Sequence, residues 1–66
     1  MIYENIKAIC DEMGITISEL EKRAGIGNGV IGGWRTSIPR ADKLKAVADV
    51  LGVTLDELMK EPAAVD

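Results

Sequence analysis

The chain has 66 residues, of which 47% are hydrophobic and 29% are charged. A chain of this length forms a single domain with one small core, which excludes a two-domain enzyme. The composition is too apolar for a disordered chain and too interrupted by charges for a membrane span. With one cysteine, Cys10, and no histidine, the chain offers neither an internal disulfide nor a set of zinc ligands. We therefore expect a metal-free protein of the reducing cytoplasm.

The charges are unevenly distributed along the chain, whose formal net charge is −3. From Lys22 to Lys45, six basic residues accompany one acid, a net of +5, whereas the rest of the chain has two basic residues and ten acids, a net of −8. A basic region on an acidic body can bind a phosphate backbone. A solvated surface without a partner explains the charges alone equally well, so the motifs must decide between the two interpretations.

Apolar residues at helical spacing predict two short helices in the first part of the chain. The first helix, which Gly14 ends, is predicted by an apolar stripe that consists of Ile2, Ile6, Ile9 and Met13. The second helix begins after Thr16, because Thr16 and Glu19 have the spacing of a capping box. Its apolar face ends at Gly25 and consists of Ile17, Leu20 and Ala24.

Three further helices and no strand are predicted after Gly25. A weak third helix over residues 28–34 is expected to place Trp34 in the core, and a loop follows around Pro39. The fourth helix is indicated by the stripe Leu44, Val47, Ala48 and Leu51, and Gly52 ends it. A second capping box, from Thr54 to Glu57, begins a last helix that runs through Met59. Residues 1–60 are predicted to form the domain, and residues 61–66 a C-terminal tail.

Together, these residues resemble the helix-turn-helix domain of phage repressors and Cro-like regulators, the XRE type. The resemblance covers about residues 2–59 and includes two short helices joined at Gly25-Ile26-Gly27. Its most specific part is the run Ala48-x-x-Leu-Gly-Val-Thr-Leu-Asp-Glu-Leu58. The resemblance implies an all-α fold, a compact five-helix bundle of the lambda-repressor type, whose third helix enters the major groove of DNA.

The same resemblance implies a set of positions that contact DNA. Asn28 stands at the start of the third helix, where its amide suits an adenine edge. Thr16 and Ser18 stand at the amino end of the second helix, which contacts phosphate in the family. The remaining positions lie in the third helix or in the loop after it. The full candidate set is Thr16, Ser18, Gly27, Asn28, Gly29, Gly32, Gly33, Arg35, Thr36, Ser37, Arg40 and Lys43.

Several residues depart from the family's pattern in this region. Gly29, Gly32 and Gly33 stand where other members have polar side chains, and Glu21 stands where a small residue lets the two helices approach. Glycine inside a helix costs about 0.8–1 kcal/mol relative to alanine, so the third helix is expected to fray. Three explanations of the glycines stay open: close packing on the second helix, simple tolerance, and a close approach of the backbone to a ligand.

We expect a sequence-specific DNA-binding transcriptional regulator, a repressor, with no catalytic residue, metal or cofactor. The run from Gly27 to Gly32 matches the dinucleotide motif Gly-x-Gly-x-x-Gly, but a predicted helix instead of a strand precedes it. Two alternatives stay open: an antitoxin-like or antirepressor module that binds proteins, and a detached amino-terminal domain of a longer repressor. Members of the family bind palindromic sites as dimers. The residues expected to form a weak dimer contact are Leu55, Leu58 and Met59.

Overall fold

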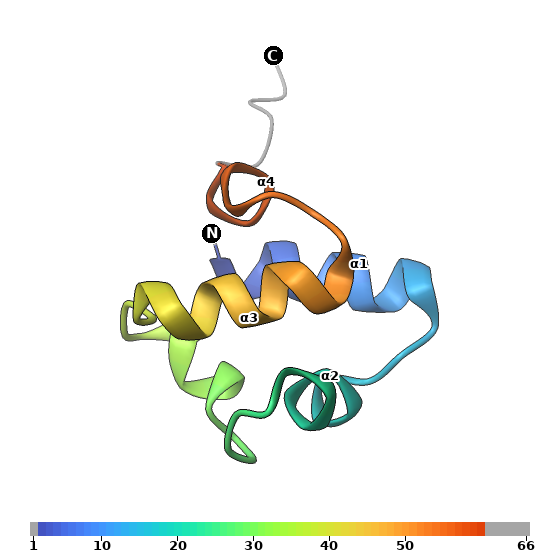
Figure 1. Cartoon of the computed structure of the whole chain (residues 1–66), viewed down its shortest axis with the longest axis horizontal. Helices are drawn as coiled ribbons and strands as arrows, with labels where there is room; N and C mark the ends of the chain where they lie inside the picture. Colours follow the sequence, from blue (N-terminus) through green and yellow to red (C-terminus); the bar gives the residue numbers. More distant parts are fainter. Residues whose placement is uncertain (1, 61–66) are drawn as a thin grey trace.

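The structure, a computed structural model, describes residues 2–60. It contains, in chain order, α1 (Ile2–Met13), α2 (Ile17–Ala24), the 3-10 helix η1 (Ile31–Arg35), α3 (Ala41–Leu51) and α4 (Leu55–Met59). In the view of Figure 1, α3 lies in front of α1, with α2 below these two helices and α4 above them. Residues 2–60 contain no strand, which confirms the all-α fold. The predicted tail, residues 61–66, lies outside the described residues.

The core lies where these elements meet. α2 packs on α3, η1 and α4 each pack on α1, and α3 also contacts α4. Every helix contributes at least one buried side chain, and Trp34 is buried as predicted. Burial of apolar surface is the main favourable term in folding, so all five elements depend on one shared core. The buried apolar residues are Ile6, Cys10, Leu20, Ile31, Trp34, Leu44, Val47, Ala48, Leu51 and Leu58.

The ends of the α-helices agree with the sequence signals. The Thr16 hydroxyl accepts the N–H of Glu19 at 3.0 Å, and the Glu19 carboxylate accepts the N–H of Thr16 at 3.1 Å, which completes the capping box. Gly25 ends α2 with φ +73°, a left-handed conformation that glycine adopts without steric cost. The Thr54 hydroxyl accepts the N–H of Glu57 at 3.2 Å at the start of α4. The predicted ends of α1, α2 and α3 at glycines and the predicted starts of α2 and α4 at capping threonines are confirmed, whereas the start of α3 at Ala41 was not predicted.

Asn5 ties the first helix to the last. Its Nδ2 donates to the carbonyl oxygen of Leu58 at 2.8 Å and to that of Lys60 at 2.7 Å. Carbonyls at the C-terminal end of a helix have no partner within the helix. The Asn5 amide therefore supplies the donors that the end of α4 lacks, and it fixes the position of that end on α1.

The predicted third α-helix is wrong. Residues 28–30 form a turn, and helical structure begins at Ile31 as a 3-10 helix of five residues. The physical reason is Gly29, whose φ of +86° does not fit a right-handed helix. Of the five predicted helices, residues 2–60 thus contain four as α-helices. A 3-10 helix stands in place of the third.

The apolar stripe of α1 also differs from the prediction. The buried line runs through Ile6 and Cys10, so Ile9 is half-buried and Met13 is 45% exposed. Cys10 has no exposed surface. Burial raises the pKa of its thiol, because an apolar environment disfavours the thiolate. Cys10 is therefore a core residue with low reactivity.

Candidate nucleic-acid interface

The candidate interface is built around the turn between α2 and η1. The N–H of Val30 donates to the carbonyl oxygen of Gly27 at 3.2 Å, which closes a four-residue turn over Asn28 and Gly29. The positive φ of Gly29 stands at the third position of this turn, where type II turns favour glycine. Asn28 is exposed in the middle of the turn. The turn thus presents its side chain to solvent, ahead of η1.

The buried carboxylate of Glu21 accepts hydrogen bonds from the backbone of this turn and of η1. Glu21 lies on α2 and is only 3% exposed. Its Oε1 accepts the N–H of Gly29 at 3.1 Å, and its Oε2 accepts the N–H of Ile31 at 2.9 Å. The first residue of η1 and the turn before it are therefore both bound to the same side chain of α2.

The outer face of η1 carries almost no side-chain atoms. Ile31 and Trp34 point into the core, with 0% and 8% exposure. Between them, a methyl group added at Gly32 or Gly33 would meet no atom of another part of the described structure within 4 Å. Close packing on α2 therefore does not explain these two glycines. Tolerance and close approach to a ligand remain as explanations.

Arg35, the last residue of η1, is bound to α1. Its guanidinium lies over the ring of Tyr3, 4.5 Å from the centroid, and Nη2 donates to the Tyr3 hydroxyl at 3.0 Å. This hydrogen bond raises the pKa of Arg35 further above its ordinary value. An arginine has five N–H donors, so others stay available for a phosphate while Tyr3 fixes the direction of the side chain.

Thr36 and Ser37 serve first to end η1. The Ser37 hydroxyl donates to the carbonyl oxygen of Gly33 at 2.8 Å, and the Thr36 hydroxyl donates to the same oxygen at 3.5 Å. A hydroxyl has one proton to donate, and a phosphate only accepts. Ser37 would therefore have to give up its bond to Gly33 before its hydroxyl contacted DNA, which weakens its assignment as a phosphate contact.

Basic residues flank the turn and η1. Arg40 precedes α3 and its Nε lies 3.4 Å from Oδ1 of Asp42, so its charge is partly neutralised. Lys43 is half-buried in the first turn of α3 and forms no ion pair within residues 2–60. At the end of α2, Lys22 and Arg23 are exposed and likewise have no acidic partner among these residues. Four cations thus stand close in sequence to this segment, two at the end of α2 and two at the start of α3.

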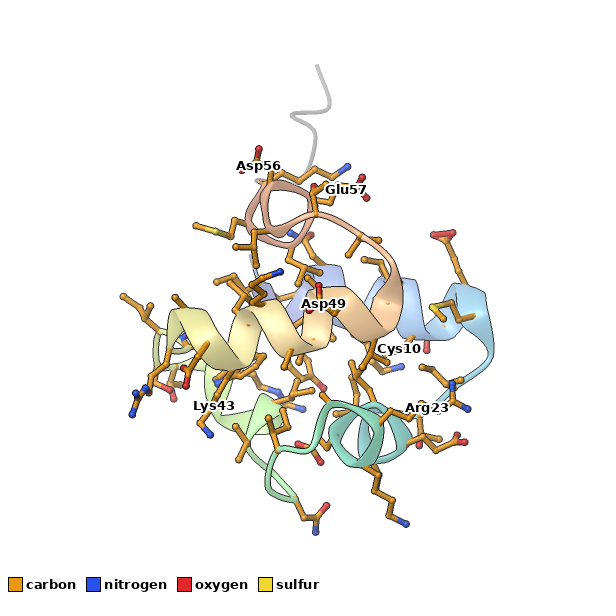
Figure 2. All side chains as sticks on the ribbon, viewed as in Figure 1. Cys10, Arg23, Lys43, Asp49, Asp56 and Glu57 are labelled. Atoms are coloured by element: carbon orange, nitrogen blue, oxygen red, sulfur yellow. The ribbon has the colours of Figure 1, made fainter. Side chains whose placement is uncertain are left out.

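Figure 2 shows how these charges are separated in space. Arg23 and Lys43 lie on the side of the molecule that α2 and the following turn form. Asp56 and Glu57 lie at the opposite end, on α4. These two cations and the two acids of α4 therefore lie on opposite sides of the folded domain.

The remaining candidates from the sequence lie at the amino end of α2. Thr16 caps the helix with its hydroxyl, and Ser18 is exposed in the first turn. They are one helix away in sequence from the turn at residues 27–30, and the structure records no contact that joins the two groups. The candidate set therefore falls into three parts: the start of α2, the turn with η1, and the start of α3.

Sequence reasoning missed the roles of Glu21 and Tyr3. A signal for Glu21 existed, because this residue follows Ile17 by four positions and thus lies on the apolar face of α2. Tyr3 gave no comparable signal, since its partner Arg35 is 32 residues away. Within residues 2–60, no group of three or more acidic, cysteine or histidine side chains could hold a metal ion, and no helix has the length and apolar character needed to cross a membrane.

α2 and η1 are two short helices joined by a tight glycine turn, and the outer face of η1 is bare. This is the arrangement of a helix-turn-helix. The sequence model of the family described as Helix-turn-helix matches residues 6–58. The chain therefore belongs to this family, the XRE-type helix-turn-helix domains of Cro and repressor proteins. Searches of curated proteins and of solved structures found no significant match. Domains of this family bind DNA and regulate transcription, so the expected class of protein is confirmed at this level.

Proposed function

We propose that this domain is a transcriptional repressor that places the turn of residues 27–30 and η1 in the major groove of its operator. One observation supports the proposal above all: Asn28 is exposed in a turn that Glu21 and Gly29 hold in one shape. An amide pairs with the N6 and N7 atoms of adenine through one donor and one acceptor. Asn28 is therefore assigned as the base-reading side chain.

The cations around the turn are assigned to the phosphate backbone. Phosphate contacts fix the position of a protein on DNA and carry no sequence information directly. Arg40 before α3 and Arg35 on η1 are charged and exposed, and the half-buried Lys43 adds a charge in the first turn of α3. Thr16 and Ser18 at the start of α2 are assigned as further contacts. The bare backbone at Gly32 and Gly33 allows a close approach to DNA.

Selection of bound sequences from a random DNA pool tests the proposal. Once a preferred site is known, Asn28→Ala should cost about 1–3 kcal/mol of binding free energy on that site and little on random duplex. Arg40→Ala and Lys43→Ala should weaken binding about equally on all sequences and reduce the salt slope by about one each. An equal loss on both duplexes for Asn28→Ala would contradict its assignment as the base reader.

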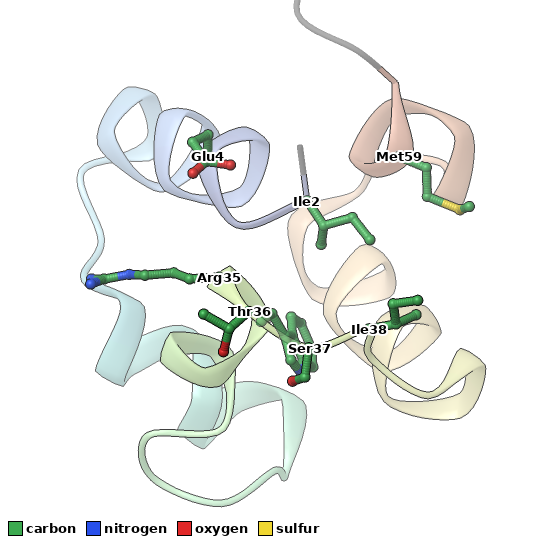
Figure 3. Close-up of a pocket in the computed structure, with 8 residues that line it drawn as sticks. Ile2, Glu4, Arg35, Thr36, Ser37, Ile38 and Met59 are labelled. Atoms are coloured by element: carbon green, nitrogen blue, oxygen red, sulfur yellow. The ribbon is translucent and has the colours of Figure 1, made fainter.

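A weak dimer on DNA is part of this proposal, but its surface differs from the one expected from the sequence. Leu58 has no exposed surface and belongs to the core, so it is unable to contact a second copy. Met59 and Ile38 are 57% and 91% exposed. Figure 3 shows them with Ile2 around one pocket, which the end of η1 also lines. A second copy seated there would lie beside the DNA-facing segment.

Two-fold related copies would read half-sites about 34 Å apart. Because so small an apolar surface supports little affinity, we expect a monomer at micromolar concentration and a dimer on palindromic DNA. Sedimentation with and without the selected duplex measures both states. Ile38→Ser should abolish cooperative binding to two half-sites and leave binding to a single half-site unchanged. A tight dimer in the absence of DNA would contradict the expectation.

One observation favours a second function, a protein-binding antitoxin or antirepressor module. The absence of side chains at Gly32 and Gly33 removes two positions at which a recognition helix would read bases. A salt series on random duplex separates the two functions, since phosphate contacts make the logarithm of affinity fall with the logarithm of salt concentration. A domain that binds no duplex at low salt would favour the protein-binding module. A detached amino-terminal domain of a longer repressor would bind DNA in the same way as the proposed repressor.

A further inference from the structure

Glu21 is the only charged side chain that is buried among residues 2–60. Its surroundings are apolar, since Leu20 beside it and Ile31 opposite it have no exposed surface. Moving a carboxylate out of water costs several kcal/mol unless hydrogen bonds replace its hydration. The presence of this charge in the core therefore requires specific partners.

Those partners are two backbone N–H groups and no cation. The ion pairs of residues 2–60 involve Asp11, Asp42 and Asp49, and none includes Glu21. Its two carboxylate oxygens instead accept one N–H each, from Gly29 and from Ile31. Hydrogen bonds to an ionised acceptor are about twice as strong as those between neutral groups, so the pair forms a stiff link between α2 and the segment after it.

These two hydrogen bonds restrain the end of the turn, because they hold the peptide N–H groups of Gly29 and Ile31. Gly29 follows Asn28 directly, and its N–H points inward to Glu21. Val30 closes the turn from the other side by donating to Gly27. Ordering a backbone residue costs conformational entropy. The turn contains Gly27, Asn28 and Gly29, and its two glycines would otherwise let it sample many conformations. Bound in this way, the turn presents Asn28 in one orientation.

If only its charge mattered, Glu21 would weaken the binding of DNA. A carboxylate under a DNA-facing surface repels phosphate, so its removal should strengthen binding to any duplex. We propose that Glu21 is the positioning residue for base readout: its two backbone hydrogen bonds hold the turn of residues 27–30 so that Asn28 meets the base edge. This inference rests on the proposed DNA-binding function, and it assigns sequence specificity to a residue that does not contact DNA.

Two matched variants separate positioning from charge. Glu21→Gln keeps the size of the side chain, but an amide has one acceptor oxygen for two N–H groups, so one of them loses its partner. Glu19→Gln removes the same charge from the same helix, and glutamine still fits the capping box. The measurement is affinity for the selected duplex and for random duplex, at a temperature at which each variant is fully folded by circular dichroism.

Positioning predicts that Glu21→Gln loses about tenfold in affinity on the selected duplex, which corresponds to about 1.4 kcal/mol, and changes by less than about twofold on random duplex. Glu19→Gln should leave the ratio of the two affinities unchanged. Unchanged or stronger binding of Glu21→Gln to the selected duplex would overturn the proposal, and so would an equal loss on both duplexes. A wild-type protein that selects no sequence would overturn the proposed function together with this role.

Amide hydrogen exchange of the wild-type protein tests the link without any substitution. Gly29 and Asn28 are neighbours in an exposed turn, but the Gly29 amide donates to Glu21. The Gly29 amide should therefore exchange at least about tenfold more slowly than the Asn28 amide. Equal exchange rates would overturn the proposal even if Glu21→Gln failed to fold.

Discussion

The segment of residues 25–40 directly precedes helix α3 in the chain. Different kinds of contact determine the conformations of these two regions. α3 buries Leu44 and three other side chains at regular helical spacing. The segment before it buries Ile31 and Trp34 and is otherwise held by side chains of other elements, Glu21 of α2 and Tyr3 of α1. A regular helix is thus set by its own pattern, whereas the segment of residues 25–40 takes its shape from contacts with residues outside it.

The largest expected effect tests whether the segment is as much a part of the core as α3. Ile31→Ala and Leu44→Ala should each lower the free energy of unfolding by about 2–5 kcal/mol, because both side chains are buried. A domain of this size has only about 3–5 kcal/mol in total. Urea denaturation in a stabilising osmolyte measures both. A much smaller loss for Ile31→Ala would show that the segment is a loosely attached loop.

A smaller effect concerns the left-handed residue of the turn. Gly29→Ala places a Cβ atom on a residue with φ +86°, and a left-handed conformation costs other residues roughly 1–2 kcal/mol. For a domain of this size, each kcal/mol lowers the melting temperature by about 4–8 °C. Thermal denaturation provides the test. An unchanged melting temperature would mean that the turn adopts another shape in solution.

Gly32→Ala is the matched control in the same segment and should have the opposite sign. Gly32 has no positive φ, and an added methyl group meets open space. The variant should therefore be stabilised by about 0.4–1 kcal/mol, chiefly because alanine restricts the unfolded chain. Stabilisation with intact DNA binding indicates simple tolerance, and stabilisation with lost binding indicates that the backbone approaches DNA there. A destabilised variant would contradict the open space around Gly32.

The smallest expected effect concerns the burial of Cys10 in the core that both regions share. Burial raises the pKa of Cys10 in the folded protein above its ordinary value of 9.0. A thiol that stays neutral in the folded state contributes stability below the unfolded-state pKa and loses it as the pH rises through the folded-state pKa. The free energy of unfolding should therefore fall above about pH 9 more steeply in the wild type than in Cys10→Ala. Parallel curves for the two proteins would show that water reaches Cys10.

Most limits of α1, α2, α3 and α4 could be predicted because they depend on residues close in sequence. The exception is the start of α3, where the side chain of Arg40 forms no capping hydrogen bond. Thr16 with Glu19 and the stripe from Leu44 to Leu51 act within one or two helical turns. The shape of the third element could not be predicted, because it depends on a bond from Glu21 to Ile31, ten residues away. A charged residue at that point indicated a departure from the family's pattern, but the acceptors it supplies become visible only once the turn is folded.

The contacts of the candidate residues with DNA stay predictions. The sequence located these residues near the glycine turn, and in the structure Asn28 lies in that turn, Arg35 ends η1 and Lys43 lies in the first turn of α3. It did not reveal that Ser37 already donates to Gly33 or that Leu58 lies in the core. The first is a tertiary feature of a short loop, and the second depends on how α4 rotates against α1. Neither follows from helical periodicity in a five-residue helix.

The two hydrogen bonds from Asn5 to the end of α4 also determine when folding is completed during synthesis. They join residues 53 and 55 positions apart, so α1 is made first and waits for almost the whole domain before it gains these partners. Contacts of such separation form late and slow the folding of small proteins. Until α4 has been synthesised, the side of α1 that it covers has no partner in the nascent chain.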